Sequence, residues 1–479
     1  MSSNKVFGAL IWKLLERIAV QGINLIVQIV LARVLLPVDF GNLAIIVAII
    51  NYAAIFVQSG VSTVIIQRKD ITDIDISTLL LSSLFFALIL YIGLFFAAPF
   101  ISNLYGTEDL IWPLRILSLL LFFNSVNAIQ VGIYSREMDF KKIFIRSLIA
   151  VLVSGLVGIM MALNGFGLWA LVAHNLINMA MIVLSMSFDK KLWFKLKFSF
   201  CSFKKLYVFT GKIIATSIIT GGSDLLRALV IGKKYSPDDL AYYDKAYTFS
   251  NYSMQIIGQS VTSVVLPSLS KKQEDKQRLK DLTRQSIRLS AFIVFPILMG
   301  VAAVAESFVV IVLTEKWLNC VPYLMLFCVL RMPSFISSID KQVYYALGKS
   351  EINLYYEIGF LILNTITLFI CVQFGILYIA IGVTVIEWIG CISLFFVSRG
   401  AIDYTLIERI SDLWRPLLNS TAMFIVTYFV GRLFDVHLLR FVVQIFTGLS
   451  VYTLLCFVTK DNNIKEIKNI IRRRDAKND

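Results

Sequence analysis

Long apolar stretches recur along the whole chain, separated by short polar connections. An α-helix needs roughly 20 apolar residues to cross a bilayer, and fourteen stretches reach about that length. They are 10–32, 41–66, 76–98, 112–133, 144–163, 168–187, 206–231, 241–268, 288–312, 321–346, 354–373, 376–398, 416–432 and 439–458. Six of the seven Trp residues fall at or just outside their ends, where an interfacial aromatic belt is expected. The pattern predicts an all-α polytopic membrane protein with about 14 transmembrane helices.

The composition supports this fold class. Hydrophobic residues make up 58% of the 479 residues and charged residues only 16%, more apolar surface than a soluble core could bury. Lys and Arg concentrate in alternate connections, and because basic loops stay in the cytoplasm, both termini are predicted to be cytoplasmic. The net charge of +14 then reflects loops attracted to anionic membrane lipids, so nucleic-acid binding is not implied. The first span carries charges and lacks a cleavage site, so it is expected to be retained.

The chain repeats itself at a distance of two hundred residues without a gap. Nine positions carry the same residue in both copies, namely Gly22, Leu25, Val30, Pro37, Asp39, Asn51, Tyr52, Val61 and Val64 and their counterparts Gly222, Leu225, Val230, Pro237, Asp239, Asn251, Tyr252, Val261 and Val264. Six spans separate the two copies, so both halves should have the same orientation, as two parallel six-helix lobes. An internal repeat in an apolar chain is typical of a membrane transporter whose substrate path lies between the repeats.

The repeat and the charge pattern together predict five segments. Residues 1–187 form an N-terminal six-helix lobe, and residues 188–205, which are rich in Lys, form a cytoplasmic linker. Residues 206–398 form a C-terminal six-helix lobe, and residues 399–459 add the thirteenth and fourteenth spans. Residues 460–479 are a basic cytoplasmic tail.

Polar side chains at helical spacing mark four spans, two from each half. The set comprises Lys13, Arg17, Gln21 and Asn24 in the first span, Asn51 in the second, Lys212, Asp224 and Arg227 in the seventh, and Asn251, Gln255 and Gln259 in the eighth. The simplest geometry makes these spans the walls of a water-filled cavity between the lobes. Interhelical hydrogen bonding is the alternative, and it explains the amides well. It explains the cations poorly, because a charge at the bilayer centre costs roughly 2.5–3.5 kcal/mol or more.

Cations on both sides of one cavity suit an anionic cargo, because guanidinium groups pair with phosphate or carboxylate oxygens. Arg331 in the tenth span extends this basic lining. Asp224, Glu357 and Glu387 are candidates to carry a coupling H⁺ or Na⁺. Asp224 could instead pair with Arg227 three residues away, whereas Glu357 and Glu387 have no cation at helical spacing on their own helices.

No motif for catalysis or for a cofactor is present. The six Cys residues form no CxxC pair and sit in or beside apolar spans, apart from one in an inner loop, so neither a disulfide nor a metal site is expected. HExxH, GxSxG and paired zinc-ligand motifs are absent from the sequence. The chain is therefore predicted to be a transporter, with no catalytic residue, metal or cofactor.

Four stretches carry a family resemblance: LARVLLPVDFG at 31–41, QSG at 58–60, REMDFKK at 136–142 and GFGLWALV at 165–172. They resemble the Wzx-type polysaccharide exporters of the multidrug/oligosaccharidyl-lipid/polysaccharide (MOP) superfamily, particularly the colanic-acid and teichuronic-acid branch. The resemblance implies a V-shaped fold of fourteen helices whose cavity is lined by spans 1, 2, 7 and 8. In related flippases an acidic residue of helix 1 or 7 can bind the coupling ion. Asn24 here stands opposite Asp224, so a first-lobe ion site is not carried over.

The resemblance also implies a cargo and a location. The cargo is an undecaprenyl-diphosphate-linked oligosaccharide, which is moved to the outer leaflet of the bacterial inner membrane for surface polysaccharide synthesis. It leaves room for transient contact with polysaccharide-biosynthesis enzymes. Two alternatives remain: an ion-coupled multidrug exporter of the same superfamily, which should have an acidic cavity, and a membrane-embedded polysaccharide polymerase or ligase, which should have a long outer loop.

Overall fold

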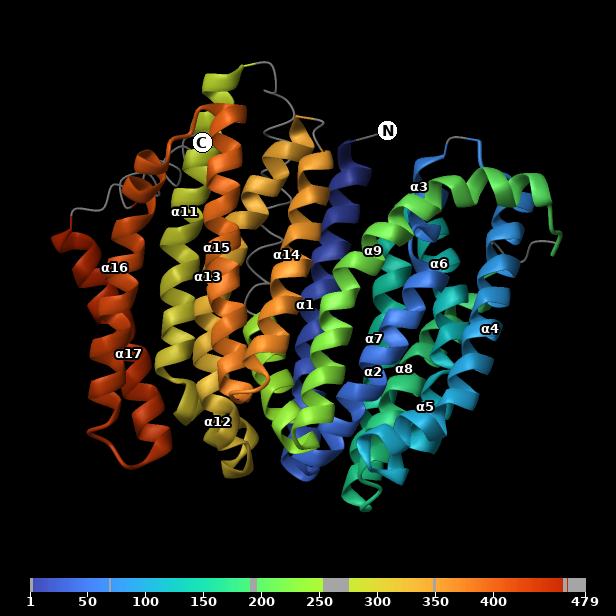
Figure 1. The fold of residues 1–479 in the computed structure, drawn as a ribbon, viewed down its shortest axis with the longest axis horizontal. Coiled ribbons are helices and arrows are strands. Elements are labelled where there is room, and N and C mark those ends of the chain that lie inside the picture. The colour runs from blue at the N-terminus through green and yellow to red at the C-terminus, as the bar shows by residue number, and fades with distance from the viewer. Residues whose placement is uncertain are drawn as a thin grey trace. The chain divides into compact units, whose positions relative to one another are not determined.

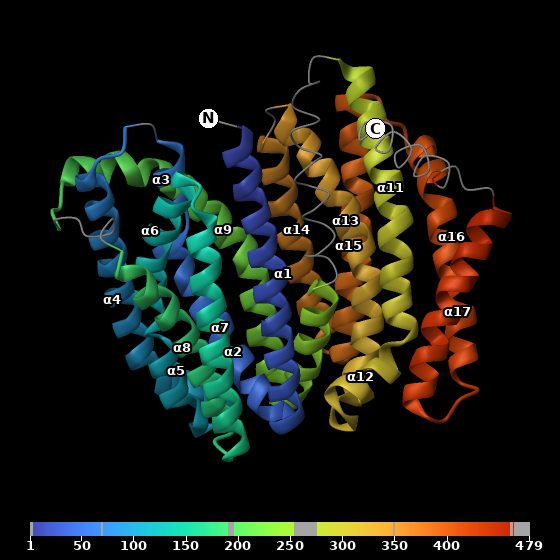
Figure 2. The same cartoon turned by 180° about the vertical axis from the view of Figure 1, so that it is seen from behind.

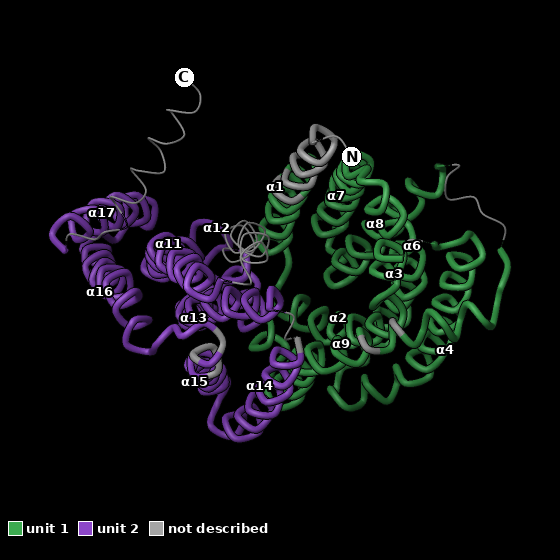
Figure 3. Tube along the Cα trace, turned by 90° about the horizontal axis from the view of Figure 1, so that it is seen from above, with its two compact units in different colours: residues 1–241 green, residues 242–479 purple. Residues whose placement is uncertain are grey.

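The regular structure of the described residues is entirely helical. The computed structural model describes residues 3–68, 70–189, 196–252, 275–347, 350–459 and 463 (Figure 1). Their packing divides the chain into two compact units, Met1–Ala241 and Tyr242–Asp479 (Figure 3). The two units are described separately below.

The first unit contains nine labelled helices: α1 (Ser3–Val34), α2 (Pro37–Gln58), α3 (Val61–Gln67), α4 (Asp73–Tyr105), α5 (Ile111–Leu117), α6 (Leu120–Glu137), α7 (Phe140–Leu163), α8 (Leu168–Ser187) and α9 (Phe200–Lys234). The second contains α11 (Lys276–Ala303), α12 (Ala305–Leu313), α13 (Val321–Ala346), α14 (Ser350–Cys371), α15 (Ile376–Ile402), α16 (Leu406–Gly431) and α17 (His437–Val458). Short 3₁₀ turns at Glu108–Leu110 and Glu315–Cys320 precede α5 and α13. Residues 237–252 are also helical and run across the division between the units.

The helices confirm the predicted polytopic membrane fold. Within the described ranges, eleven helical segments are long and apolar enough to cross a membrane. The three other predicted spans account for the difference from fourteen. The stretch 10–32 lies in α1, whose apolar part is Ala19–Val34, and 416–432 lies in α16 and its C-cap residue. Most of 241–268 falls outside the described residues.

Gly60 divides the second span into α2 and α3. Its φ of +79° lies in the left-handed region that glycine adopts without strain, and it is the N-cap residue of α3. A Cβ at this position would also lie 3.1 Å from Cγ2 of Thr210 on α9. The QSG motif therefore marks a required break in the helix, at a point where α9 passes close by.

Small residues let the helices of the first unit approach closely. In Figure 2, α1, α7 and α8 lie side by side. Gly155 of α7 faces Val27 of α1, where an added Cβ would lie only 2.6 Å from the Val27 Cγ2. Gly158 of α7 faces His174 of α8 in the same way, at 3.0 Å from its Cβ. These contacts follow the pattern of small residues at membrane helix interfaces.

The first unit includes α9, which packs on α2 and α4. Tyr207 of α9 donates a hydrogen bond to Ser82 of α4 at 3.0 Å, and Tyr105 of α4 donates to the Leu229 carbonyl at 3.2 Å. The end of the linker is also fixed here, since the Lys197 N–H donates to Ser77 Oγ at 2.7 Å. The repeat assigns α9 to the lobe 206–398, whereas packing groups it with α2 and α4. The lobe boundaries themselves stay a prediction.

Ion pairs attach α16 and α17 to the rest of the second unit. Arg409 of α16 forms a bidentate pair with Asp340 of α13, with both side chains fully buried and both N–O distances 2.8 Å. Arg440 of α17 forms a second bidentate pair, with Glu306 of α12, at 2.8 and 2.9 Å. The first pair is fully buried, so either charge left alone there would be costly, whereas the Glu306 side chain of the second pair is 36% exposed. Both pairs connect an added helix to the rest of the unit.

Candidate functional site

A group of charged side chains lies between α13, α14, α15 and the helix at 237–252. We call it the unit-2 charge cluster; its members are Tyr247, Arg331, Lys341, Glu357 and Glu387. Arg331 and Lys341 are ten residues apart on α13, close to three helical turns, which places them on one face of that helix. Glu357 comes from α14 and Glu387 from α15. The cluster thus brings together three of the residues that were predicted from the sequence to bind substrate or ions.

Arg331 is the buried cation of this cluster. Its side chain is 8% exposed, and its guanidinium lies over the ring of Tyr247 at 4.4 Å from the centroid. Its Nε and Nη2 have no hydrogen-bond acceptor among the described residues. Glu387 of α15 lies near enough to Arg331 and Ser334 for both to influence its charge, while the Ser334 hydroxyl itself donates to the Leu330 carbonyl at 3.1 Å. Buried donors without acceptors are energetically unfavourable, and they are available to an anion that enters the site.

Lys341 and Glu357 form an ion pair at the edge of the cluster. The Nζ–Oε1 distance is 2.6 Å, and each side chain is 26% exposed. Lys341 also lies over the ring of Tyr356 at 4.8 Å, and its carbonyl accepts a hydrogen bond from the Asn353 amide at 3.2 Å. No cation lies at helical spacing from Glu357 in the sequence; its partner comes from the neighbouring helix instead.

The first unit presents a polar stripe on α9. Thr216, Thr220 and Asp224, four residues apart, are all exposed, and the Asp224 side chain reaches 64% exposure. Arg227 is 17% exposed and pairs with Asp224 at 2.7 Å, which is the self-pairing considered in the sequence. The stripe lies in the apolar span Ile213–Lys234, where an exposed carboxylate facing acyl chains would be strongly unfavourable. This face of α9 is therefore expected to meet water or protein.

The other predicted cavity residues fall into two groups. Gln21 and Asn24 on α1 and Asn251 on the helix at 237–252 are half-buried, and Asn51 on α2 is exposed. The side chains of Lys13, Arg17 and Lys212 and the residues Gln255 and Gln259 lie outside what the structure describes. Their roles stay predictions.

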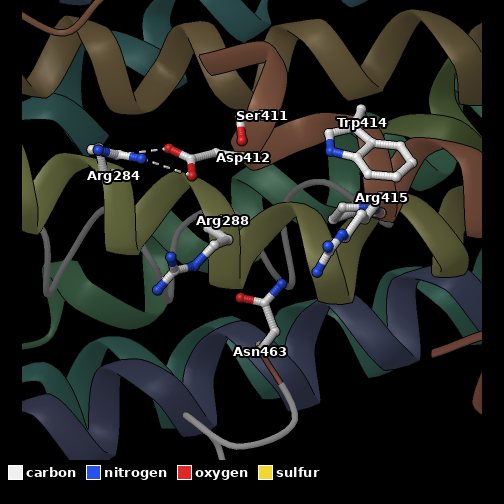
Figure 4. Close-up of a pocket in the computed structure, with 8 residues that line it drawn as sticks. Arg284, Arg288, Ser411, Asp412, Trp414, Arg415 and Asn463 are labelled. Atoms are coloured by element: carbon white, nitrogen blue, oxygen red, sulfur yellow. Dashed lines mark hydrogen bonds and ion pairs between the residues drawn. The ribbon is translucent and has the colours of Figure 1, made fainter. Parts of the chain in front are cut away.

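Some buried or clustered charges were not predicted. Lys245, in the helix at 237–252, is only 7% exposed, and it is not part of the polar spacing that links Asn251, Gln255 and Gln259. Arg284 and Arg288, four residues apart on α11, come together with Arg415 of α16, which is more than a hundred residues further along the chain (Figure 4). No local signal connects residues so far apart.

Comparison with known proteins identifies the family. A family model described as "Polysaccharide biosynthesis protein" matches residues 30–322, more than half of the chain. The chain belongs to this polysaccharide biosynthesis protein family.

Two curated proteins are similar to this chain over most of their own length. The lipopolysaccharide biosynthesis protein WzxC of Escherichia coli (strain K12) is 24% identical over 435 residues, covering 88% of this chain and 86% of that protein. The succinoglycan biosynthesis transport protein ExoT of Rhizobium meliloti (strain 1021) is 20% identical over 475 residues, covering 97% and 95%.

Solved structures share the fold. The lipid II flippase MurJ, in an inward closed conformation, matches with a TM-score of 0.78 at 17% identity, covering 96% of this chain and all of that one. An inward-facing multidrug resistance MATE family transporter of the MOP superfamily matches with a TM-score of 0.64 at 16% identity, covering 82% of this chain and 98% of that one. The family match and the relatives confirm the resemblance to Wzx-type proteins, and the solved structures show that this chain shares the fold of MurJ and of a MOP-superfamily MATE transporter.

Proposed function

We propose that this family member is a flippase that moves an undecaprenyl-diphosphate-linked oligosaccharide from the inner to the outer leaflet of the bacterial cell membrane by alternating access. The family and the names of the relatives support a role in surface polysaccharide synthesis. The observation that carries the proposal is the buried Arg331, which has two guanidinium nitrogens without hydrogen-bond acceptors among the described residues.

A diphosphate headgroup fits the chemistry of these cations. Its oxygens accept charge-assisted hydrogen bonds from planar guanidinium groups, and such bonds are stronger in a water-poor site. Arg331 is held over Tyr247, so its orientation is restricted before a ligand arrives. The lipid tail would remain in the bilayer while the charged head crosses.

The carboxylates of the unit-2 charge cluster provide a route for ion coupling. Glu357 contacts Lys341 directly, while Glu387 lies near Arg331 and Ser334. An H⁺ or Na⁺ bound by either carboxylate would change the net charge that Arg331 and Lys341 present to an anionic headgroup. Binding of the ion and of the cargo would then be linked through one set of contacts.

The orientation in the membrane completes the proposal. The concentration of Lys and Arg in alternate connections supports cytoplasmic N- and C-termini, with the linker 188–205 and the tail 460–479 on the same side. The lipid-linked substrate would then be taken up from the cytoplasmic leaflet, where such oligosaccharides are assembled, and transient contact with the assembling enzymes would occur there.

The test is restoration of surface polysaccharide in a strain that lacks the chromosomal gene. Arg331→Ala is expected to abolish polymer, and Arg331→Lys, which keeps the charge but not the planar fork, should restore only part of it. Arg432→Ala is the matched control, because Arg432 is an exposed arginine that contacts Tyr428 on its own helix. Normal polymer with Arg331→Ala, at equal amounts of protein in the membrane, would contradict the proposal.

The same strains distinguish a flippase from a multidrug exporter. If cationic drugs were the cargo, loss of Arg331 would leave polymer unchanged and would alter drug resistance. A flippase predicts the opposite result for both measurements.

A further inference from the structure

Arg115 of α5 makes a hydrogen bond in place of one that α4 lacks. Pro99 lies inside α4, and because proline has no N–H, it cannot donate to the Phe95 carbonyl four residues earlier. The Nε of Arg115 donates to this carbonyl instead, at 3.1 Å. The contact joins α4 to α5, which pack against each other (Figure 1). One edge of the Arg115 guanidinium is therefore held by the backbone of α4.

Two aromatic rings restrict the same guanidinium further. Its Cζ lies 4.1 Å from the ring centroid of Phe95 and 5.2 Å from that of Trp112. Within the described part of the chain, Nη1 and Nη2 of Arg115 have no hydrogen-bond acceptor, and no carboxylate forms an ion pair with them. The nearest acidic residues in the sequence, Glu108 and Asp109, are exposed in the turn before α5. With Nε engaged, the edge formed by Nη1 and Nη2 remains for an anion.

The surface around Arg115 faces lipid. Exposed apolar side chains recur at helical spacing along one side of the membrane-spanning helix α4; they are Phe85, Leu88, Ile89, Ile92, Phe96 and Phe100. The ring of Phe96, which is 75% exposed, lies 5.8 Å from that of Phe95, so this side reaches the ring beside Arg115. Trp112 is also exposed, and Trp concentrates at the level of the lipid headgroups. Arg115 thus lies near headgroup depth beside acyl chains, where a cation needs a counter-charge.

We propose that Arg115 binds the phosphate of a membrane phospholipid through Nη1 and Nη2, with Phe96 and Trp112 beside the bound lipid. The two nitrogens present parallel N–H donors that match a pair of phosphate oxygens. Because the Phe95 carbonyl and the two rings already orient the guanidinium, binding costs little conformational entropy. An anionic glycerophospholipid is favoured over a zwitterionic one, since its net charge balances that of Arg115. In the membrane orientation proposed above, the lipid belongs to the outer leaflet; the site itself does not depend on the transport function.

The experiment crosslinks a phosphatidylglycerol that carries a photoreactive diazirine near the top of one acyl chain to the purified full-length chain. Peptide mass spectrometry then measures the adducts on α4 and α5. Arg115→Gln removes the charge and the paired donors, and we expect it to lower these adducts about tenfold. Arg432→Gln is the matched control, because Arg432 is exposed on the other unit and also lies over an aromatic ring, that of Tyr428, at 4.9 Å. It should leave the adducts on α4 and α5 unchanged.

A competition measurement on the wild type needs no variant, and it decides the question if Arg115→Gln does not yield monodisperse protein. Unlabelled phosphatidylglycerol should displace the adducts on α4 and α5 at about tenfold lower concentration than phosphatidylcholine, whose headgroup has no net charge. Equal displacement by the two lipids would overturn the proposal, as would displacement by inorganic phosphate but not by phosphatidylglycerol. Equal adducts in the wild type and a monodisperse Arg115→Gln would overturn it too. An equal loss in Arg115→Gln and Arg432→Gln would do the same, because only general surface charge would then matter.

Discussion

Gly41→Ala should destabilise the contact between the start of α2 and the segment that follows α9. Gly41 is buried, and a Cβ added there would lie 1.8 Å from the carbonyl oxygen of Pro237, 2.4 Å from its carbonyl carbon and 2.9 Å from its Cα. All three are backbone atoms, so no side-chain rotation can relieve the overlap. To restore an ordinary contact of about 3.4 Å, the two segments would have to move apart by about 1.6 Å.

This movement would disturb neighbouring contacts along α2 and α9. Ile45 of α2 packs against Gly232 of α9, and Tyr105 bonds to the Leu229 carbonyl one turn earlier. Inserting a methyl group into a close-packed interface typically costs about 1–3 kcal/mol. In the two-hundred-residue register the position opposite Gly41 is Ala241, so the second copy of the repeat has a methyl group where the first cannot.

The assay is the loss of monodisperse protein on heating in detergent, followed by size-exclusion chromatography. Gly41→Ala is expected to lower the apparent melting temperature by a few degrees. Gly93→Ala on α4 is the control, because an added Cβ there has no atom within 4 Å and alanine favours a helix. If Gly41→Ala melted at the same temperature as Gly93→Ala, the conclusion that α2 packs closely against the Pro237 backbone would be refuted.

Three further predictions concern charged groups. Arg409→Met leaves Asp340 buried without its partner and should destabilise the chain by about 3–5 kcal/mol, and adding Asp340→Leu should recover most of the loss in the same melting assay. The hydrogen bond from Lys280 lowers the pKa of Glu408 from 4.5 to about 2. Because the folded-state pKa is depressed, this stabilisation is complete above about pH 4.5 and is lost as the pH falls toward 2; Lys280→Gln should therefore flatten the decline in melting temperature over that window. Glu357→Gln should reduce polysaccharide export and make the remainder insensitive to collapse of the ion gradient.

Exposed residues on the same helices supply the controls. Glu351, in the first turn of α14, is exposed, so Glu351→Gln should leave export and its response to the ion gradient unchanged. Arg432→Met, at the exposed C-cap of α16, should not change the melting temperature appreciably. Export by Glu357→Gln that still followed the gradient would exclude this residue as the coupling site. A melting temperature for Arg409→Met equal to that of Arg432→Met would show that the buried pair contributes nothing.

Helix positions could be predicted closely because the membrane imposes one length and one kind of surface on every span. The stretches 168–187 and 321–346 coincide with α8 and α13. Helix breaks were not predicted, since the stretch 41–66 is long and apolar enough to be one span, and only the backbone of Gly60 shows where it divides into α2 and α3. The pattern of polar spacing along α9 was also predicted, because residues four apart on one helix share a face whatever packs beside it.

Partners across helices could not be predicted in the same way. The pairs Lys341–Glu357, Arg409–Asp340 and Arg284–Asp412 each join two different helices, and their sequence separations of 16, 69 and 128 residues follow no helical period. Helix periodicity constrains which residues share a face, but the rotation and depth at which two helices pack depend on side chains along their whole length. In a bilayer a buried cation must nevertheless find a counter-charge or a ligand. The sequence of such a chain therefore predicts that its buried charges have partners, but it does not say which. Within the described part of the chain, Nε and Nη2 of Arg331 have no acceptor, and this indicates where an anionic ligand would supply one.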